Sequence, residues 1–348
     1  MRKVKKEFMG FSCVAVLVSF AAVMAGPSQG NPSGAEGAGP APPASRMDNL
    51  IAAYYLNRDP DSGKVTTFLF PIAYLRQGQF HEASVRHDAV DKPQMLEPGM
   101  TFHVMDGGEP IGTFSVQQVG PVSLMCSEMI GGLGEFRGAK SDEELFLELA
   151  RKALGVRYVE GEEHIYIRVE TYCALRLHTP SAAKKRALDA KQMETLKQDL
   201  VELVGRLKIW RRAEYPAETE ALIQQNLTLE RLDLTDLDND GVLEAFGKFV
   251  AQLEPDRPEQ GQSGSIYYGL FGVTFARPEP RVFFQAHSTQ STESWGSGHD
   301  FVAAEDMDGD GVKEVMLTFG GWEYIRFQIY KLAEGELRMV FEGAEYGC

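Results

Sequence analysis

The sequence is poor in basic residues and has no basic stripe of the kind that binds nucleic acid. Lys and Arg together number 35 against 50 Asp and Glu, so the formal charge is −15. An acidic surface repels phosphate backbones and favours cations. No run of Lys or Arg interleaved with aromatic residues opposes this bias. The composition therefore argues against a nucleic-acid partner.

Motifs of common enzymes are also missing. A hydrolase nucleophile elbow needs G-x-S-x-G, which no string in the chain matches. A zinc peptidase needs H-E-x-x-H, but Val85 stands where the second histidine should follow His81. The glycines in 132–138 miss the dinucleotide motif by one residue. No catalytic residue is predicted, and an enzyme would need the fold to bring His81, His87 and His103 together with acidic residues.

Only one apolar run approaches the length that could cross a membrane. It spans residues 8–25 and follows four basic residues within the first six, as in a signal peptide. Val23 and Ala25 supply a small-residue cleavage site, so we expect residues 1–25 to be removed and the protein to be periplasmic or extracellular. An uncleaved anchor is the alternative, because a spanning helix needs roughly 20 residues. The mature chain has no second such run, and its formal charge is 31 − 49 = −18.

Cysteine is scarce, with 4 in the whole chain. Cys126, Cys173 and Cys348 remain after cleavage. Export permits a disulfide, and Cys126 with Cys173 is the favoured pair, because both lie in the first half of the mature chain. Two buried free thiols are the alternative. Cys348 is left over in either case, as a free or an intermolecular thiol.

The first part of the mature chain reads as a linker followed by a mixed domain. Residues 26–46 lack aromatic and large aliphatic side chains, which predicts a disordered linker. Residues 47–178 predict an α+β domain. Within it, 66–119 has strand-like runs and a hairpin turn, 141–154 reads as a helix that begins with a capping box, and 163–177 reads as a strand.

The second part reads as a helical segment followed by a β domain. Residues 179–226 carry leucines at helical spacing, and Pro216 divides this segment into two. Residues 227–348 contain short β runs, among them a hairpin of 266–276 with 281–287. The expected fold class is α+β and predominantly β, with an incomplete propeller-like C-terminal domain.

Two acidic loops of identical pattern carry the sharpest chemistry. Both read D-x-D-x-D-G-x-x-E and lie 70 residues apart. Ca²⁺ takes about six to eight oxygen ligands, and carboxylates on alternate residues of a tight loop can converge on one point. Without a cation the four carboxylates of each loop repel one another. The predicted ligands are Asp236, Asp238, Asp240, the Val242 carbonyl and Glu244 in one loop, and Asp306, Asp308, Asp310, the Val312 carbonyl and Glu314 in the other.

These loops do not belong to EF-hands. The glutamate required at position 12 is replaced by Gly247 and Leu317, and strand-like sequence follows the second loop. An acidic loop that runs directly into a strand resembles the FG-GAP or VCBS repeats of integrin-type propeller domains, over residues 230–348. The resemblance implies Ca²⁺ held between strands by the Asp and Glu residues named above. A propeller needs about four to eight blades, for which this segment is too short.

The sequence therefore predicts an exported, calcium-binding, non-enzymatic structural or binding protein, with two Ca²⁺ ions stabilising the β domain. The alternatives are an exported hydrolase with a calcium-stabilised scaffold, a calcium-responsive regulator, and acidic turns that only reverse the chain. A protein or carbohydrate ligand is expected if certain aromatic residues form a contact surface instead of core. These residues are Tyr267, Tyr268, Trp295, Trp322 and Tyr324.

Overall fold

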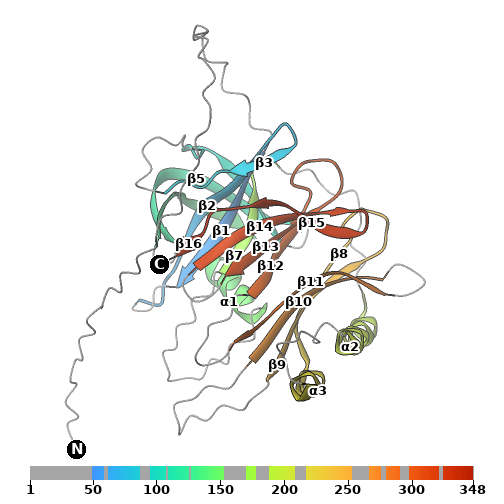
Figure 1. The fold of residues 1–348 in the computed structure, drawn as a ribbon. Helices are drawn as coiled ribbons and strands as arrows, with labels where there is room; N and C mark the ends of the chain where they lie inside the picture. Colours follow the sequence, from blue (N-terminus) through green and yellow to red (C-terminus); the bar gives the residue numbers. More distant parts are fainter. Residues whose placement is uncertain are drawn as a thin grey trace, which may run out of the picture. The chain divides into compact units, whose positions relative to one another are not determined.

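In the computed structural model, antiparallel β-strands make up most of the residues that can be described, which confirms the predominantly β character (Figure 1). The signal segment 1–25 and the linker 26–46 predicted from the sequence lie outside the described residues. Residues 46–348 form one compact unit. The structure describes residues 49–58, 62–86, 95–106, 109–124, 127–152, 170–177, 188–207, 217–252, 266–275, 280–290, 298–320 and 324–347.

The first half of the compact unit is a six-stranded antiparallel barrel. The ring closes because the strand Asn49–Arg58 pairs with the strand Glu170–Leu175 on one side and with the strand Val65–Arg76 on the other. A short strand, β3 (Gln79–Glu82), adds to the edge of β2. In spatial order the ring consists of β1 (Asn49–Arg58), β7 (Glu170–Leu175), β4 (Thr101–Asp106), β5 (Glu109–Leu124), β6 (Ser127–Gly138) and β2 (Val65–Arg76).

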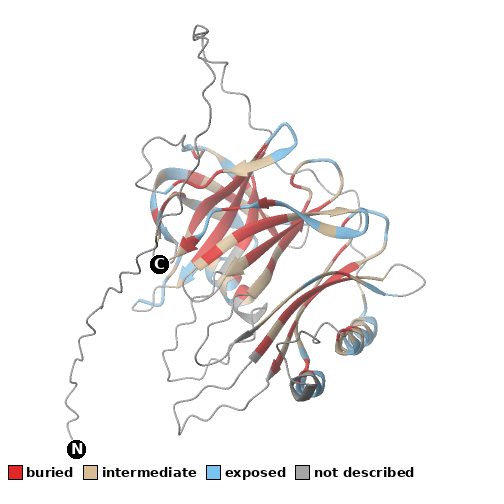
Figure 2. Ribbon diagram, in the orientation of Figure 1, coloured by how far each residue is buried: buried red, intermediate tan, exposed pale blue. Residues whose placement is uncertain are grey.

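Strand β1 is buried on both faces, as Figure 2 shows by its colour. Successive side chains of a strand point to opposite sides. Leu50 and Tyr54 accordingly join one hydrophobic cluster with Phe114, from the barrel. Ile51 and Tyr55 join a different cluster that contains residues of the C-terminal half. The barrel therefore has an outer apolar face that another layer must cover.

Helix α1 (Asp142–Lys152) begins with the predicted capping box, which is confirmed. The Ser141 amide donates to Glu144 Oε2 at 2.8 Å, and the Glu144 amide donates to Ser141 Oγ at 3.3 Å. The fully buried Tyr54 donates its hydroxyl to Asp142 Oδ1 at 2.5 Å. Leu145 packs into the barrel cluster. The helix is thus fixed to the barrel at its N-terminus.

The second half contains two four-stranded antiparallel meanders, in which strands adjacent in sequence are also adjacent in space. A two-residue strand, β16 (Tyr346–Gly347), pairs with β14 of the second meander. The predicted hairpin of 266–276 with 281–287 is confirmed as β10 and β11. The first meander is β8 (Thr228–Thr235), β9 (Glu244–Gln252), β10 (Ile266–Thr274) and β11 (Arg281–Gln290); the second is β12 (Gly298–Glu305), β13 (Glu314–Gly320), β14 (Tyr324–Ala333) and β15 (Glu336–Glu342).

Two helices, α2 (Ala190–Arg206) and α3 (Ala217–Asn226), cover one face of the first meander. Leu200 of α2 and Ile223 of α3 pack with Phe249 of β9. Helix α2 also has a capping box, formed by Asp189 and Gln192, that the sequence analysis did not identify. Pro216 lies outside the described residues. Among the helices of the described part, none combines the length and the apolarity needed to cross a bilayer.

The second meander lies between the first meander and the barrel. On one face, Val315 and Leu317 pack with Phe246 of the first meander. On the other face, Phe327 packs with Phe70 of the barrel. The segments 47–178, 179–226 and 227–348 that the sequence delineates are thus consecutive parts of one unit with shared cores.

Cys173 is a free thiol that is fully buried in the core shared by the barrel and the second meander. Burial raises the pKa of this thiol, and the nearby Glu305 adds to the shift. At Cys173 the structure has the buried free thiol and not the favoured disulfide. Cys126 and Cys348 lie outside the described residues.

The close contact of β5 and β6 makes Gly134 sensitive to substitution. A Cβ added at Gly134 would lie 1.9 Å from the Ser115 carbonyl oxygen. We expect Gly134→Ala to lower the free energy of unfolding by about 1–3 kcal/mol, measured by urea denaturation, because the backbone must shift. Gly205→Ala in α2 is the control, since a Cβ there meets nothing within 4 Å. Equal stability of the two variants would contradict this account.

Candidate metal centre

The two acidic loops occupy the same place in the two meanders. The first loop, 236–244, joins β8 to β9, and the second loop, 306–314, joins β12 to β13. Each turns through two residues with positive φ. These are Asn239 (59°) and Gly241 (84°) in the first loop, and Gly309 (79°) and Gly311 (91°) in the second. Glycine and asparagine tolerate this left-handed conformation best, so the two loops share one backbone path.

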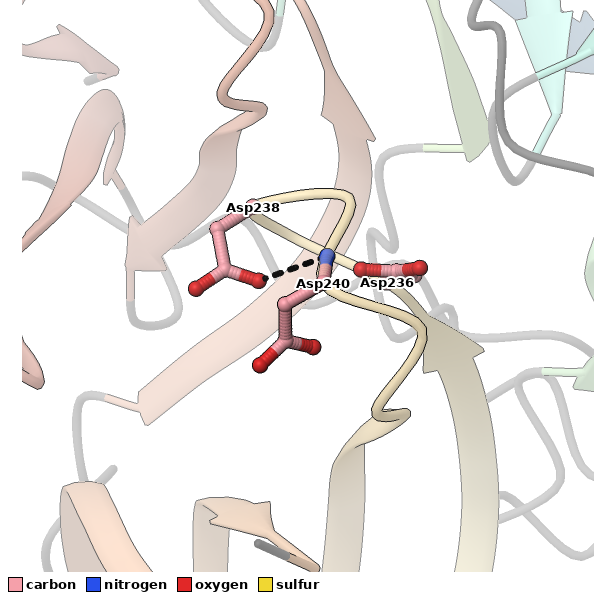
Figure 3. Close-up of side chains that lie close together, drawn as sticks. All are labelled: Asp236, Asp238 and Asp240. Atoms are coloured by element: carbon pink, nitrogen blue, oxygen red, sulfur yellow. Dashed lines mark hydrogen bonds between the residues drawn. The ribbon is translucent and has the colours of Figure 1, made fainter.

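Backbone amides orient the carboxylates of the first loop, and Figure 3 shows one of these hydrogen bonds, from the Asp240 amide to Asp238. The Gly241 amide donates to Asp236 Oδ2 at 3.0 Å, and the Val242 amide donates to Asp240 Oδ1 at 2.7 Å. The Asp240 amide donates to Asp238 Oδ1 at 3.3 Å. The second loop repeats these three hydrogen bonds 70 residues later, at 3.1, 2.8 and 3.1 Å respectively. These three hydrogen bonds are thus common to both loops, and the second loop has a further one from the Gly309 amide to Asp306 Oδ1 at 2.7 Å.

Oxygen atoms of Asp236, Asp238 and Asp240 all lie within 4.8 Å of one another. Oxygens bonded to one Ca²⁺ at about 2.3–2.6 Å are at most about 5 Å apart, so this spacing fits a shared ion. Asp236 Oδ1 is buried and has no hydrogen-bond partner among the described residues. A buried carboxylate oxygen in that state is costly unless a cation or water satisfies it. The first loop therefore fits a hard cation.

The second loop forms a different cluster. Oxygens of Asp306, Asp308 and Glu314 lie within 4.8 Å of one another, and Asp310 is not among them. In the first loop, by contrast, Glu244 is not part of the corresponding group. Of the ten predicted ligands, the structure thus gathers three carboxylates in each loop. The amides of Val242 and Val312 are hydrogen-bond donors to the loop aspartates.

The two glutamates connect each loop to its following strand. Glu244 is 5% exposed and Glu314 is 0% exposed. The Leu237 amide donates to Glu244 Oε2 at 2.9 Å, and the Met307 amide donates to Glu314 Oε2 at 2.8 Å. The side chains of Leu237 and Met307 are themselves buried in hydrophobic clusters. Each loop is therefore fastened by one apolar side chain and one buried carboxylate.

The side chain of Lys331, on β14, reaches the carboxylates of the second loop. Lys331 Nζ is 2.6 Å from Asp308 Oδ2, 2.6 Å from Asp310 Oδ2 and 3.1 Å from Glu314 Oε1. Burial opposes the charged form of Lys331, but the hydrogen bond to Asp308 and its neighbours outweigh it and raise the lysine pKa. Sequence reasoning missed Lys331, because only the strand register places it opposite the loop.

The two loops also contact each other. The Lys313 amide donates to the Leu237 carbonyl at 2.7 Å, and Asn239 Nδ2 donates to the Gly311 carbonyl. Lys313 Nζ donates to Thr235 Oγ1 at 3.2 Å. Hydrogen bonds therefore connect the two loops directly.

Of the three histidines that an enzyme would need to bring together, the two that are described lie apart in the barrel. His81 on β3 stacks on Tyr74 with ring centroids 5.1 Å apart, and His103 lies on β4, which is not adjacent to β3 in the barrel. His87 lies outside the described residues. In the part of the chain that is described, the groups suited to a metal contain only Asp and Glu.

One aromatic residue proposed for a contact surface belongs to the core. Tyr267 is 0% exposed and packs among the residues between the first meander and its helices. Tyr268 and Tyr324 are partly buried, whereas Trp295 and Trp322 lie outside the described residues. Tyr267 is therefore a core residue and cannot belong to a contact surface formed by these aromatic side chains.

Burial of the two glutamates makes the stability of the metal-free protein depend on pH. Burial, with nearby aspartate charge, raises the pKa of Glu244 and of Glu314 from 4.5 to about 7. The folded state then binds more protons than the unfolded state between these values, so stability falls as pH rises from about 4.5 to about 7. In calcium-depleted buffer, we expect the doubly substituted Glu244→Gln, Glu314→Gln protein to show a smaller fall in melting temperature over this range. A steeper fall in the variant would contradict the assignment.

Comparisons with known proteins add no family to this geometry. No family model matches the chain, and no curated protein or solved structure is significantly similar to it. The resemblance to FG-GAP or VCBS repeats comes from the sequence of the two loops and not from these comparisons. The function must therefore be inferred from the residues and their arrangement.

Proposed function

We propose that this is an exported, calcium-binding, non-enzymatic protein with a structural or binding role, whose acidic loops stabilise the β-meanders when they take up Ca²⁺. The observation that carries the proposal is the first loop, in which three carboxylates lie within 4.8 Å of one another. A buried oxygen of Asp236 has no hydrogen-bond partner among the described residues. The same backbone network recurs in the second loop.

The donor set favours calcium over other metals. The grouped ligand atoms are carboxylate oxygens, without the imidazole or thiolate groups that zinc and copper prefer. Calcium tolerates variable coordination and accepts water and backbone carbonyls beside carboxylates, whereas magnesium demands near-ideal octahedral geometry. Asp238 and Asp240 are exposed, so water has access to complete the coordination. In an exported protein, calcium at millimolar concentration is sufficient to fill weak sites.

The strand arrangement supports the resemblance to FG-GAP or VCBS repeats. Each loop joins the first two strands of a four-stranded antiparallel meander, which is the size of a propeller blade. The two meanders pack on each other through one hydrophobic cluster. Helices α2 and α3 cover the outer face on one side, and the barrel covers it on the other. The two meanders therefore form a stack whose outer faces are covered by the helices and by the barrel, and they do not form a closed ring of blades.

A structural or binding role fits the described residues better than the alternative of an exported hydrolase. His81 and His103, two of the three histidines that the enzyme alternative needs, lie on strands that are not adjacent in the barrel. A protein or carbohydrate ligand remains our proposal for the binding role. The acidic character of the chain disfavours nucleic acid.

Calcium binding is tested by calorimetric titration of the purified, calcium-depleted protein. We expect saturable binding and a rise in melting temperature, because ligand at about 100 times Kd stabilises the folded state by about 2.7 kcal/mol. The doubly substituted Asp238→Ala, Asp308→Ala protein should lose both effects. Asp199→Ala, which removes an exposed aspartate on α2, is the matched control. Absence of heat and of thermal stabilisation at millimolar Ca²⁺ in the parent protein would overturn the proposal.

Export is tested by the mass and location of the protein made in its own cells. Removal of residues 1–25 should leave a chain that begins at Gly26. Mass spectrometry of the periplasmic and extracellular fractions measures this directly. A full-length chain recovered with the membranes would favour the uncleaved anchor.

A further inference from the structure

The register of the meanders puts two different residues at the same place relative to the loops. In the first meander, Thr274 on β10 pairs with Glu244, the residue that ends the first loop. In the second meander, Tyr330 pairs with Val315, so the next residue, Lys331, stands opposite Glu314. The position that faces the loop glutamate is therefore threonine in one meander and lysine in the other.

Thr274 and Lys331 differ in the charge that they bring to their loops. Thr274 Oγ1 donates to Glu244 Oε1 at 3.2 Å, which is a hydrogen bond from an uncharged hydroxyl. Lys331 places a positive charge within 3.1 Å of oxygens from three carboxylates. Among the described residues, no lysine or arginine forms an ion pair with the aspartates of the first loop. In the described part of the chain, the carboxylates of the second loop thus have an ion-paired lysine, and the aspartates of the first loop do not.

The ammonium group of Lys331 has the contacts that a bound cation would have. It bridges Asp308, Asp310 and the fully buried Glu314, and the first and last of these belong to the group of carboxylates that could share a metal. Two cations cannot share those oxygens at close range without strong repulsion. Calcium can enter the second loop only if the lysine side chain moves away.

We propose that Lys331 is a built-in counter-ion of the second loop and competes with Ca²⁺ for it, so that the first loop is the stronger calcium site. This inference rests on the proposed calcium binding. It makes the protein asymmetric: the second loop is ordered without metal, whereas the first loop depends on it. Lys331 therefore sets how many calcium ions bind at a given concentration.

A reciprocal exchange of the two facing residues tests this inference. Lys331→Thr gives the second loop the residue of the first, and Thr274→Lys does the reverse. Calorimetric titration of the purified protein with CaCl₂ measures the number of sites and the Kd of each. The parent should have one site at least about tenfold stronger than the other, since a charge-assisted contact is worth a factor of this order. Lys331→Thr should strengthen the weaker site, and Thr274→Lys should weaken the stronger one.

Thermal unfolding supplies a readout that does not depend on calcium binding. In calcium-depleted buffer, Lys331→Thr should lower the melting temperature, because three carboxylates lose their counter-ion. Calcium should restore it. Lys197→Thr, which removes an exposed lysine from α2, is the matched control for loss of charge. If Lys331→Thr does not fold, Thr274→Lys still tests the inference, because it leaves the second loop intact.

The two proposals fail in different ways. If the parent and every variant lack calcium binding, the proposed function is overturned. If the parent binds calcium at two equal sites and neither exchange alters either Kd, only the role of Lys331 is overturned. A Thr274→Lys protein that keeps the stronger site would likewise contradict the competition between lysine and metal.

Discussion

Repulsion between carboxylates confined to short loops is the constraint on which the C-terminal half depends. Each loop carries four acidic side chains within nine residues, and the loops lie against each other. The fold opposes this repulsion by directing backbone amides at the aspartates and by burying one glutamate beneath each loop. Burial alone leaves the glutamates with raised pKa values, so hydrogen bonds do not fully compensate the charge. In our proposals a cation completes the compensation: Ca²⁺ from solvent in the first loop and Lys331 in the second.

Because of where the loops lie, the compensation of their carboxylate charge affects the whole compact unit. The second meander is covered by the first meander on one face and by the barrel on the other. Asn49 Nδ2, at the start of the barrel, donates to the Met307 carbonyl within the second loop at 3.0 Å. The loops therefore lie where all three sheets are connected, and ordering them stabilises contacts between layers as well as the turns themselves. A purely structural calcium ion would suffice to explain such an arrangement.

The local features of the fold follow from the sequence because they depend on neighbouring residues. The capping box of Ser141 with Glu144, the hairpin of β10 with β11, and the two loops are all determined by residues that are close in the chain. Barrel closure was not foreseeable, since it requires β1 to pair with both β2 and the distant β7. The sequence likewise left open whether Tyr267 belongs to the core or to a contact surface, and the packing of the helices assigns it to the core.

For the candidate metal centre, the sequence by itself determined the type of ligand, its spacing and the duplication, because alternating aspartates and a glycine define a tight acidic loop without reference to the rest of the chain. Only the tertiary structure decided that the two loops differ. Lys331 follows Glu314 by 17 residues, and Thr274 follows Glu244 by 30, so no shared spacing relates them. Strand register places each beside its loop glutamate, and register is set by the packing of both sheet faces across the whole unit.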